Sequence, residues 1–260
     1  MKQRDQSDMA VPEPTTLPSD VQARWDALAD ATRQIATAAA GDDDNGFRAA
    51  WSAMKQASRG LDYQQILNSM HVQTDAGEHA EALAAMLRRI PDGWGRWISC
   101  DSGWYSLIVE LDEQLRALLP NYVIHQIKEK YGGLRYYWES GEDIHDPHDA
   151  EPPSPGRDGS EEAWTQWRRE HEAWCDRLDR YLQTPESKRR TADLERRIAL
   201  AEKLVDGVEK RADVTCELCG APGSLHRTSS RCPWYKTLCG SCAGKASYVP
   251  ARASGSTQER

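Results

Sequence analysis

The sequence predicts an α+β protein that is mostly helical, with a small antiparallel β-hairpin or sheet and a C-terminal ribbon held by cysteines. Three observations lead to this class. Several stretches carry apolar residues at steps of three and four, which is the period of an amphipathic helix. Two β-rich runs flank Gly132-Gly133, and two Cys-x-x-Cys pairs lie near the end of the 260-residue chain. This length suits two modest domains, or one core with helical additions.

The first 90 residues are predicted to be helical after a polar lead-in. Residues 1–18 are polar and rich in proline, so we expect them to be disordered. Residues 19–90 are assigned to N-terminal helices, the first of which begins at a Ser19-Asp20 N-cap, and the last of which stops before Pro91. The three predicted helices cover about 19–41, 47–58 and 76–89.

Residues 91–140 are predicted to form a module of one helix and one hairpin. Leucine and isoleucine at helical spacing indicate a helix over 105–119. The runs 122–131 and 134–138, on either side of Gly132-Gly133, predict an antiparallel hairpin. A lone hairpin is marginally stable in water, so this one must pack on the helix or join other strands.

The next segments are predicted to be a linker and a helical hairpin. Residues 141–160 are acidic and rich in Pro, Gly and Ser, which favours a linker or mobile loop. Residues 161–212 contain two apolar seams joined around Thr184-Pro185, and we expect an antiparallel helical pair whose second helix enters the ribbon. The seam residues are Trp164, Trp167, His171, Trp174, Leu178 and Tyr181, then Leu194, Ile198, Ala201, Val205 and Val208.

Four cysteines carry the strongest chemical signal in the chain. They read C-x2-C-x19-C-x2-C, and this spacing is typical of a structural zinc site bound by thiolates. Four thiolates leave no open coordination position, so the expected cofactor is structural Zn²⁺. We therefore predict a zinc ribbon over 213–249, followed by a disordered tail over 250–260. The predicted ligands are Cys216, Cys219, Cys239 and Cys242.

A rival ligand set would combine His226 or Cys232 with the first cysteine pair. Its C-x2-C-x6-H-x5-C spacing is looser than that of known zinc knuckles, and the second pair would remain unused. The four-cysteine set is the simpler interpretation.

Composition indicates a reducing compartment. Of seven cysteines, four are assigned to metal, and the odd remainder does not suit a disulfide scaffold. The N-terminus shows no apolar signal segment, and no apolar run approaches the length of a membrane span. We expect a cytoplasmic protein without a membrane partner.

Charge gives weak support to nucleic-acid binding. The formal net charge is −8, although residues 185–260 carry 14 Lys/Arg against 9 Asp/Glu. The ribbon contributes Arg227, Arg231 and Lys236, which is less than the clustered basic stripe of a strong phosphate binder. A nucleic-acid-associated regulator that uses the basic ribbon is therefore an alternative hypothesis.

Tryptophan is unusually abundant, with ten Trp against one Phe. Trp94, Trp97 and Trp104 lie close together among glycines, and core packing is the first interpretation of this group. The alternative is a partner-binding patch, because Trp is enriched in interaction hot spots. The candidate partner-binding residues are Trp94, Trp97, Trp104, Arg227, Arg231 and Lys236.

The order of several motifs resembles a family. Gly103-Trp104, the run Gln126–Tyr137, Cys216–Gly223 and Trp234–Cys239 are similar to segments of a group of uncharacterised bacterial and phage proteins. In that group a KEK(F/Y)GxLR(F/Y) hairpin precedes a helix and a C-terminal four-cysteine ribbon. The resemblance implies that hairpin, last helix and ribbon form one module, and it implies no activity.

These features favour a non-enzymatic, zinc-stabilised protein-interaction module of phage or prophage origin, with an unknown protein partner. The closed metal site and the lack of a recognisable catalytic motif support this expectation. A second alternative is an uncharacterised enzyme with a site near the hairpin, which would use His125, Lys128 or Cys100.

Overall fold

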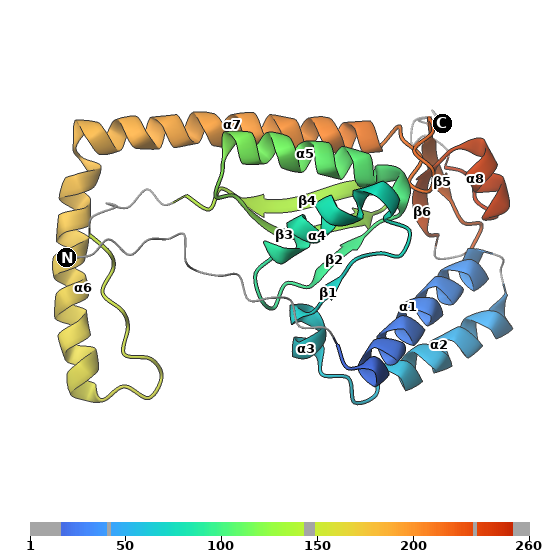
Figure 1. Ribbon diagram of the computed structural model, residues 1–260, viewed down its shortest axis with the longest axis horizontal. Coiled ribbons are helices and arrows are strands. Elements are labelled where there is room, and N and C mark those ends of the chain that lie inside the picture. Colours follow the sequence, from blue (N-terminus) through green and yellow to red (C-terminus); the bar gives the residue numbers. More distant parts are fainter. Residues whose placement is uncertain (1–16, 41–42, 143–148, 231–232, 252–260) are drawn as a thin grey trace, which may run out of the picture.

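The computed structural model confirms the α+β class, with many helices, two small sheets and a C-terminal cluster of four cysteines (Figure 1). It describes residues 17–40, 43–142, 149–230 and 233–251. The disorder predicted for both termini falls mainly outside these residues, as does part of the predicted linker.

Two N-terminal helices lie side by side at one end of the molecule (Figure 1). They are α1 (Ser19–Ala40) and α2 (Asp44–Ser58). The Asp43 carboxylate caps α2 by accepting the Gly46 N–H at 2.9 Å. A short helix that the sequence did not reveal, α3 (Tyr63–Asn68), follows behind its own aspartate cap.

A mixed four-stranded sheet forms the centre, in the order β1-β2-β3-β4. The predicted hairpin is present as an antiparallel pair, and two short strands that were not predicted extend its sheet in parallel. Main-chain pairing of Ile98 with Ile127 and of Ser99 with Lys128 thus supports a hairpin that would be marginal alone. The strands are β1 (Met70–His71), β2 (Arg96–Ser99), β3 (Val123–Lys130) and β4 (Gly133–Glu139).

Three helices build the main core against this sheet. Helix α5 (Tyr105–Leu118) matches its predicted range, and α4 (Ala80–Arg88) follows a 3-10 turn at Gly77–His79. The third is the long helix α7 (Pro185–Ala212), which packs on α5 and β4. Apolar residues of all three helices meet the inner face of the strands in one cluster. Its fully buried members include Leu83, Leu87, Ile108, Leu111, Leu115, Ile124, Ile127, Leu134 and Ala201.

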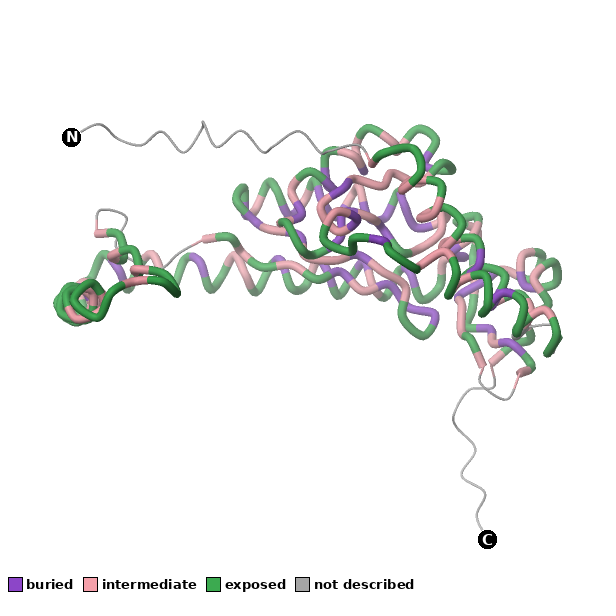
Figure 2. The backbone as a smooth tube through the Cα atoms, turned by 90° about the horizontal axis from the view of Figure 1, so that it is seen from below, coloured by how far each residue is buried: buried purple, intermediate pink, exposed green. Residues whose placement is uncertain are grey.

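The predicted antiparallel helical hairpin over 161–212 is wrong. Helix α6 (Glu161–Leu182) lies across the end of α7 instead of along it, as the two views in Figures 1 and 2 agree. The Thr184 hydroxyl caps α7 with Pro185 in its first turn, so the chain starts a new helix in a new direction. The α7 seam then finds its apolar partner in α5 and β4, which leaves α6 outside the core.

The second half of the predicted linker is bound to α6. Trp167 and Trp174 of α6 each donate an indole N–H to a backbone carbonyl of residues 149–152. The predicted burial of Trp174 is confirmed, at 5% exposure, whereas Trp164 and Trp167 remain partly exposed. We call α6 together with residues 149–160 the arm.

The C-terminal ribbon is a three-stranded sheet in the order β6-β5-β7, with one short helix. Its order extends past the predicted limit at residue 249, because Pro250 pairs with His226 and the Ala251 N–H bonds to the Leu225 carbonyl at 3.0 Å. No helix in the described ranges is long and apolar enough to cross a membrane. The elements are β5 (Ser224–Arg227), β6 (Tyr235–Leu238), α8 (Gly240–Lys245) and β7 (Val249–Pro250).

Candidate metal centre

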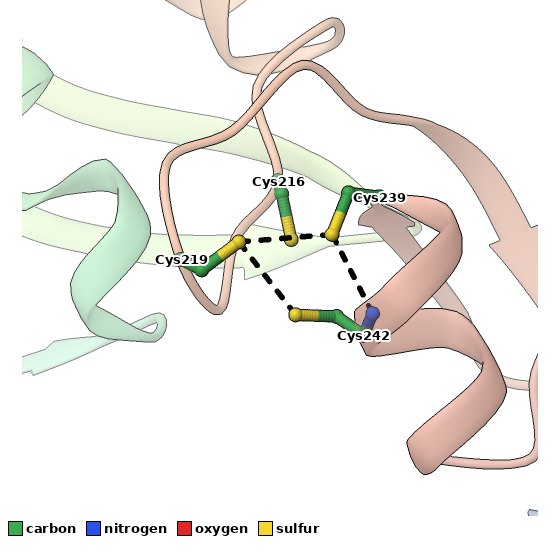
Figure 3. A group of neighbouring side chains, drawn as sticks. All are labelled: Cys216, Cys219, Cys239 and Cys242. Carbon is green, nitrogen blue, oxygen red and sulfur yellow. Dashed lines mark hydrogen bonds between the residues drawn. The ribbon is translucent and has the colours of Figure 1, made fainter.

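The four predicted cysteines converge, and their sulfur atoms all lie within 4.8 Å of one another (Figure 3). The Cys219 sulfur lies 3.7 Å from that of Cys239 and 3.6 Å from that of Cys242. A tetrahedral ion with metal–sulfur bonds of about 2.3 Å places its four sulfurs about 3.8 Å apart. The observed spacing therefore fits a tetrahedral metal ion without rearrangement of the backbone.

Two tight turns bring the cysteines together. The first pair lies in a loop that two backbone hydrogen bonds close. The Gly220 N–H donates to the Cys216 carbonyl at 2.8 Å, and the Cys216 N–H donates to the Ala221 carbonyl at 2.7 Å. Gly220 has a φ of +75°, which favours glycine. In the second pair, Cys239 directly follows β6 and is the N-cap of α8. Cys242 lies one helical turn later and therefore faces Cys239.

Hydrogen bonds within the cluster shift the pKa values of two of its sulfurs in opposite directions. The backbone N–H of Cys242 donates to the Cys239 sulfur and lowers the pKa of that thiol to about 7. Hydrogen bonds to the neighbouring sulfurs raise the pKa of Cys242 to about 12. Four thiolates this close would repel one another strongly, so a divalent cation is needed for all four to lose their protons.

The metal cluster is joined to the main body through Gly103 and Trp104. The Gly103 N–H donates to the Glu217 carbonyl at 2.8 Å, and the Trp104 indole N–H donates to the Thr215 carbonyl at 2.7 Å. A Cβ atom on Gly103 would lie 2.2 Å from the Cys216 carbonyl oxygen, so the approach requires glycine. The first metal-binding loop is therefore docked on the start of α5.

A second contact joins the ribbon to the hairpin tip. The Thr237 hydroxyl of β6 donates to the Gly132 carbonyl at 2.7 Å, and Leu225 of β5 lies over the same glycine. Farther along, the Glu209 carboxylate of α7 accepts the Tyr136 N–H at 3.1 Å. Hairpin, last helix and ribbon thus contact one another, which confirms the prediction that they pack as one unit.

Lys236 is held in a charge cluster beside the metal loop. Its ammonium lies 2.6 Å from an Asp101 oxygen and 2.8 Å from a Glu217 oxygen. Burial opposes its charge, but the carboxylates of Glu217 and Asp101 outweigh burial and raise the pKa of Lys236. Burial also raises the pKa of Glu217, whose Oε2 has no hydrogen-bond partner. Lys236 is therefore an internal counter-ion, and it is not a free basic group for a nucleic acid.

The three candidate partner-binding tryptophans do not form one surface. Trp104 is fully buried in the joint described above, so its assignment as a partner-binding residue is wrong. Trp97 contacts the rings of Trp25 and His71, at centroid distances of 5.3 and 6.1 Å. Trp94 is half exposed, and its ring lies 4.5 Å from that of His125, centroid to centroid, in a tilted arrangement.

The basic candidates of the ribbon are also separated in their roles. Arg227 donates a guanidinium N–H to the Thr228 carbonyl at 3.2 Å, while Lys236 is paired as described. Arg231 lies outside the described residues. The described part of the ribbon therefore presents no clustered basic surface of the kind that phosphate binding requires.

The three residues of the enzyme alternative, Cys100, His125 and Lys128, do not line one common pocket. Burial raises the pKa of the Cys100 thiol well above its usual value, which disfavours the thiolate that a nucleophile needs. His125 faces Glu139 at 3.3 Å, and Lys128 donates to Gln126 at 2.6 Å. Cys100 lines a cleft that neither His125 nor Lys128 lines.

That cleft was not foreseen from the sequence. It measures about 760 Å³ and lies between α1 and the carboxyl ends of β1 and β2. Trp25, His71, Asp75 and Tyr105 are among its lining residues. Because β1 has only two residues, no periodic pattern could mark the loop that follows it.

Comparison of the chain with protein-family models, with curated proteins and with solved structures finds no match. The function is therefore inferred from the geometry alone.

Proposed function

We propose that the protein is a non-enzymatic, zinc-stabilised protein-interaction module in which the arm contacts the partner. One observation supports this more than any other. Of the 22 residues of α6, all of which are described, only Trp174 is buried, and α6 leaves the body at the end of α7 (Figures 1 and 2). Ordering a helix costs conformational entropy, and α6 adds almost nothing to the core in return. This supports a role for α6 outside the fold.

In this proposal the metal ion has a structural role. Four thiolates select a soft, tetrahedral ion such as Zn²⁺ and leave no coordination position for water or substrate. The ribbon that the ion closes is bonded to the start of α5 and to the hairpin tip. Zinc would thus stabilise the platform on which α7, about 42 Å long at 1.5 Å per residue, carries the arm.

The charge of the arm is consistent with a protein partner. Helix α6 contains six Asp/Glu and four Arg, so it would repel a nucleic acid rather than attract it. Among the ribbon candidates, Lys236 is already neutralised by Asp101 and Glu217. Nothing in the described part of the chain favours the nucleic-acid alternative over this proposal.

The test is a comparison of two baits in lysate of the native host. One is the full chain, and the other lacks residues 143–192, replaced by a short Gly/Ser bridge. The bridge can be short because Glu142 already contacts Arg197 of α7, with a 2.6 Å bond from Arg197 Nη2. We expect both baits to be soluble and to bind zinc, and the full chain alone to recover a reproducible partner set.

A point variant controls for exposed aromatic surface in general. Trp51 on α2 is 44% exposed and lies on a different element from the arm. The Trp51→Ala bait should recover the same partners as the full chain. Identical partner sets for the full chain and the arm-deleted chain would refute the proposal.

A further inference from the structure

Helix α6 holds a segment of its own chain through two indole groups. Trp174 donates its N–H to the Asp149 carbonyl at 2.9 Å, and Trp167 donates its N–H to the Pro152 carbonyl at 3.0 Å. Both acceptors are backbone oxygens, which any residue can supply, proline included. The indoles therefore bind the backbone of this segment, and a proline supplies one of the two acceptors.

The spacing of the two bonds matches a proline-rich chain. Trp167 and Trp174 are seven residues apart, which is about 10.5 Å along a helix. The accepting carbonyls are three residues apart, which is about 9–10 Å in an extended or polyproline II chain. Polyproline II also repeats every three residues, so carbonyls at that interval point the same way. Two turns of α6 thus match one repeat of the bound segment.

Acidic side chains add a second element of recognition. The Asp149 carboxylate accepts bonds of 2.7 and 3.1 Å from the Arg177 guanidinium. The Glu151 carboxylate lies 3.3 Å from His171 Nε2, and the His171 ring lies between the two indoles, at 4.6 Å from Trp167 and 5.6 Å from Trp174. The α6 face therefore fits a chain with the pattern Asp-x-Glu-Pro.

We propose that this face of α6 is a binding site for an extended, acidic, proline-containing segment of a partner protein, and that residues 149–155 occupy it in cis. This inference rests on the proposed function and names the chemistry of its partner. It also corresponds to a general mode in which aromatic grooves bind proline-rich chains.

The ion pairs between α6 and its own bound segment are weak enough for a partner segment to replace them. Its ion pairs are solvent-exposed, since the Arg177 side chain is 47% exposed and that of Glu151 is 52% exposed. Exposed pairs contribute little and are screened by salt. The ion pairs therefore add little to the hold on the segment, and a competing segment of the same chemistry can take its place by accepting the two indole bonds.

The test uses a synthetic peptide with the sequence of residues 149–159, labelled with a fluorophore. It is titrated against the full-length wild type and against an open variant that carries Asp149→Ser, Glu151→Ser, Pro152→Ser, Pro153→Ser and Pro155→Ser. We expect saturable binding in fluorescence anisotropy, at least tenfold tighter for the open variant because its own segment no longer competes. Binding should weaken as salt is raised.

Two further substitutions in the open variant locate the site. Trp167→Phe keeps an aromatic ring but removes the indole N–H, and we expect it to weaken peptide binding about tenfold. Trp51→Phe on α2 makes the same change away from the arm and should leave binding unaltered. Circular dichroism of each variant verifies that its helices remain.

Several outcomes would overturn the inference. The first is that the peptide shows no saturable binding to an open variant that has kept its helices. The second is that Trp167→Phe leaves the affinity of the open variant for the peptide unchanged. The third is that the wild type binds the peptide more tightly than the open variant does. If the open variant loses helix, excess peptide is added to the wild type, and the indole N–H resonances of Trp167 and Trp174 must shift. Self-association of the wild type that is lost in the open variant would instead assign the site to a second copy of the chain. Arm-dependent partner capture would survive each of these results, so the two proposals fail independently.

Discussion

At the scale of single residues, the joint between body and ribbon depends on one indole. Trp104 is completely buried and its N–H satisfies the Thr215 carbonyl at the entrance to the metal loop. The neighbouring Gly103 allows the backbones to approach, so the pair acts together. The first interpretation of the tryptophan group, core packing, is confirmed for Trp104, which connects distant parts of the chain.

Trp104→Phe should destabilise the protein measurably. The substitution leaves the Thr215 carbonyl without its donor, which costs about 1–3 kcal/mol for a buried group, and it opens a small cavity besides. Urea denaturation followed by circular dichroism measures the change. The matched substitution Trp51→Phe, at an exposed site, should stay within about 0.5 kcal/mol of the wild type. Equal effects of the two substitutions would contradict the structural role of Trp104.

Lys236→Met should also destabilise the fold, by leaving the buried Glu217 without its counter-charge. Removing one partner of a buried pair costs about 3–5 kcal/mol, and we expect about 2–3 kcal/mol here because Lys236 keeps some exposure. Denaturant unfolding provides the measurement. The double variant Lys236→Met with Glu217→Gln should recover part of the loss, and a double variant no more stable than the single one would speak against the pairing.

The metal site could be predicted because its information is local. Two Cys-x-x-Cys pairs state both the ligands and their geometry, and the sulfurs converge as expected. The roles of Trp104 and Lys236 could not be predicted in the same way. Their partners lie more than a hundred residues away in the sequence, at Thr215 and Asp101, and no spacing rule connects such residues.

At the scale of elements, an ion pair joins the end of β4 to α7. Glu142 follows β4 and binds Arg197 of α7 through both of its carboxylate oxygens. Hydrogen bonds from Arg197 lower the pKa of Glu142 below its usual value. This contact fixes the point at which the chain leaves the body for the arm.

The Glu142→Gln substitution should have a pH-dependent effect on stability. Because the folded-state pKa lies below the unfolded value of about 4.3, the stabilisation is complete above that pH and is lost as pH falls through the folded value. At pH 7 we expect the variant to be less stable by about 0.5–1 kcal/mol, as for a partly exposed pair. Unfolding in urea at pH 7, 5, 4 and 3 should show the difference between the two proteins vanish. A difference that persists at pH 3 would exclude this electrostatic cause.

Element prediction succeeded where apolar periodicity was long. Helix α5 and the hairpin of β3 and β4 were located from their patterns, and both are present. The strands β1 and β2 were missed, since two to four residues cannot show a period and β2 directly follows Gly95. The direction of α6 was also missed, because seam spacing shows that a face is apolar without showing what covers it.

At the scale of the whole molecule, the four-cysteine ribbon contacts more than its own loop, so a metal ion bound there would stabilise other elements as well. The ribbon is bonded to the start of α5, to the hairpin tip and, through α7, to the core. Binding free energy of a structural metal is folding free energy, so its loss should spread to these contacts.

Elemental analysis should therefore find one zinc per chain. Removal by a strong chelator, or the Cys216→Ser and Cys239→Ser double substitution, should lower Tm by about 10 °C, since each kcal/mol corresponds to about 2–4 °C at this size. Limited proteolysis should then cut within residues 213–250. Cys175→Ser, which removes a thiol on α6 outside both the cluster and the main core, provides the control. An unchanged melting temperature in the absence of metal would show that the ribbon stands apart from the body.

The placement of the arm on α7 has a mechanical consequence. The core packing of α7 begins at Leu194, so the first nine residues of the helix, about 13 Å, extend beyond the apolar core. Helix α6, about 33 Å long, is joined to the N-terminal end of α7. A rotation of about 10° at the junction would move the far end of α6 by about 6 Å while α7 stays in place. If the arm contacts a partner, as proposed, such a rotation would enlarge the volume that the tip of α6 reaches and would raise the rate of encounter, while the body keeps its structure.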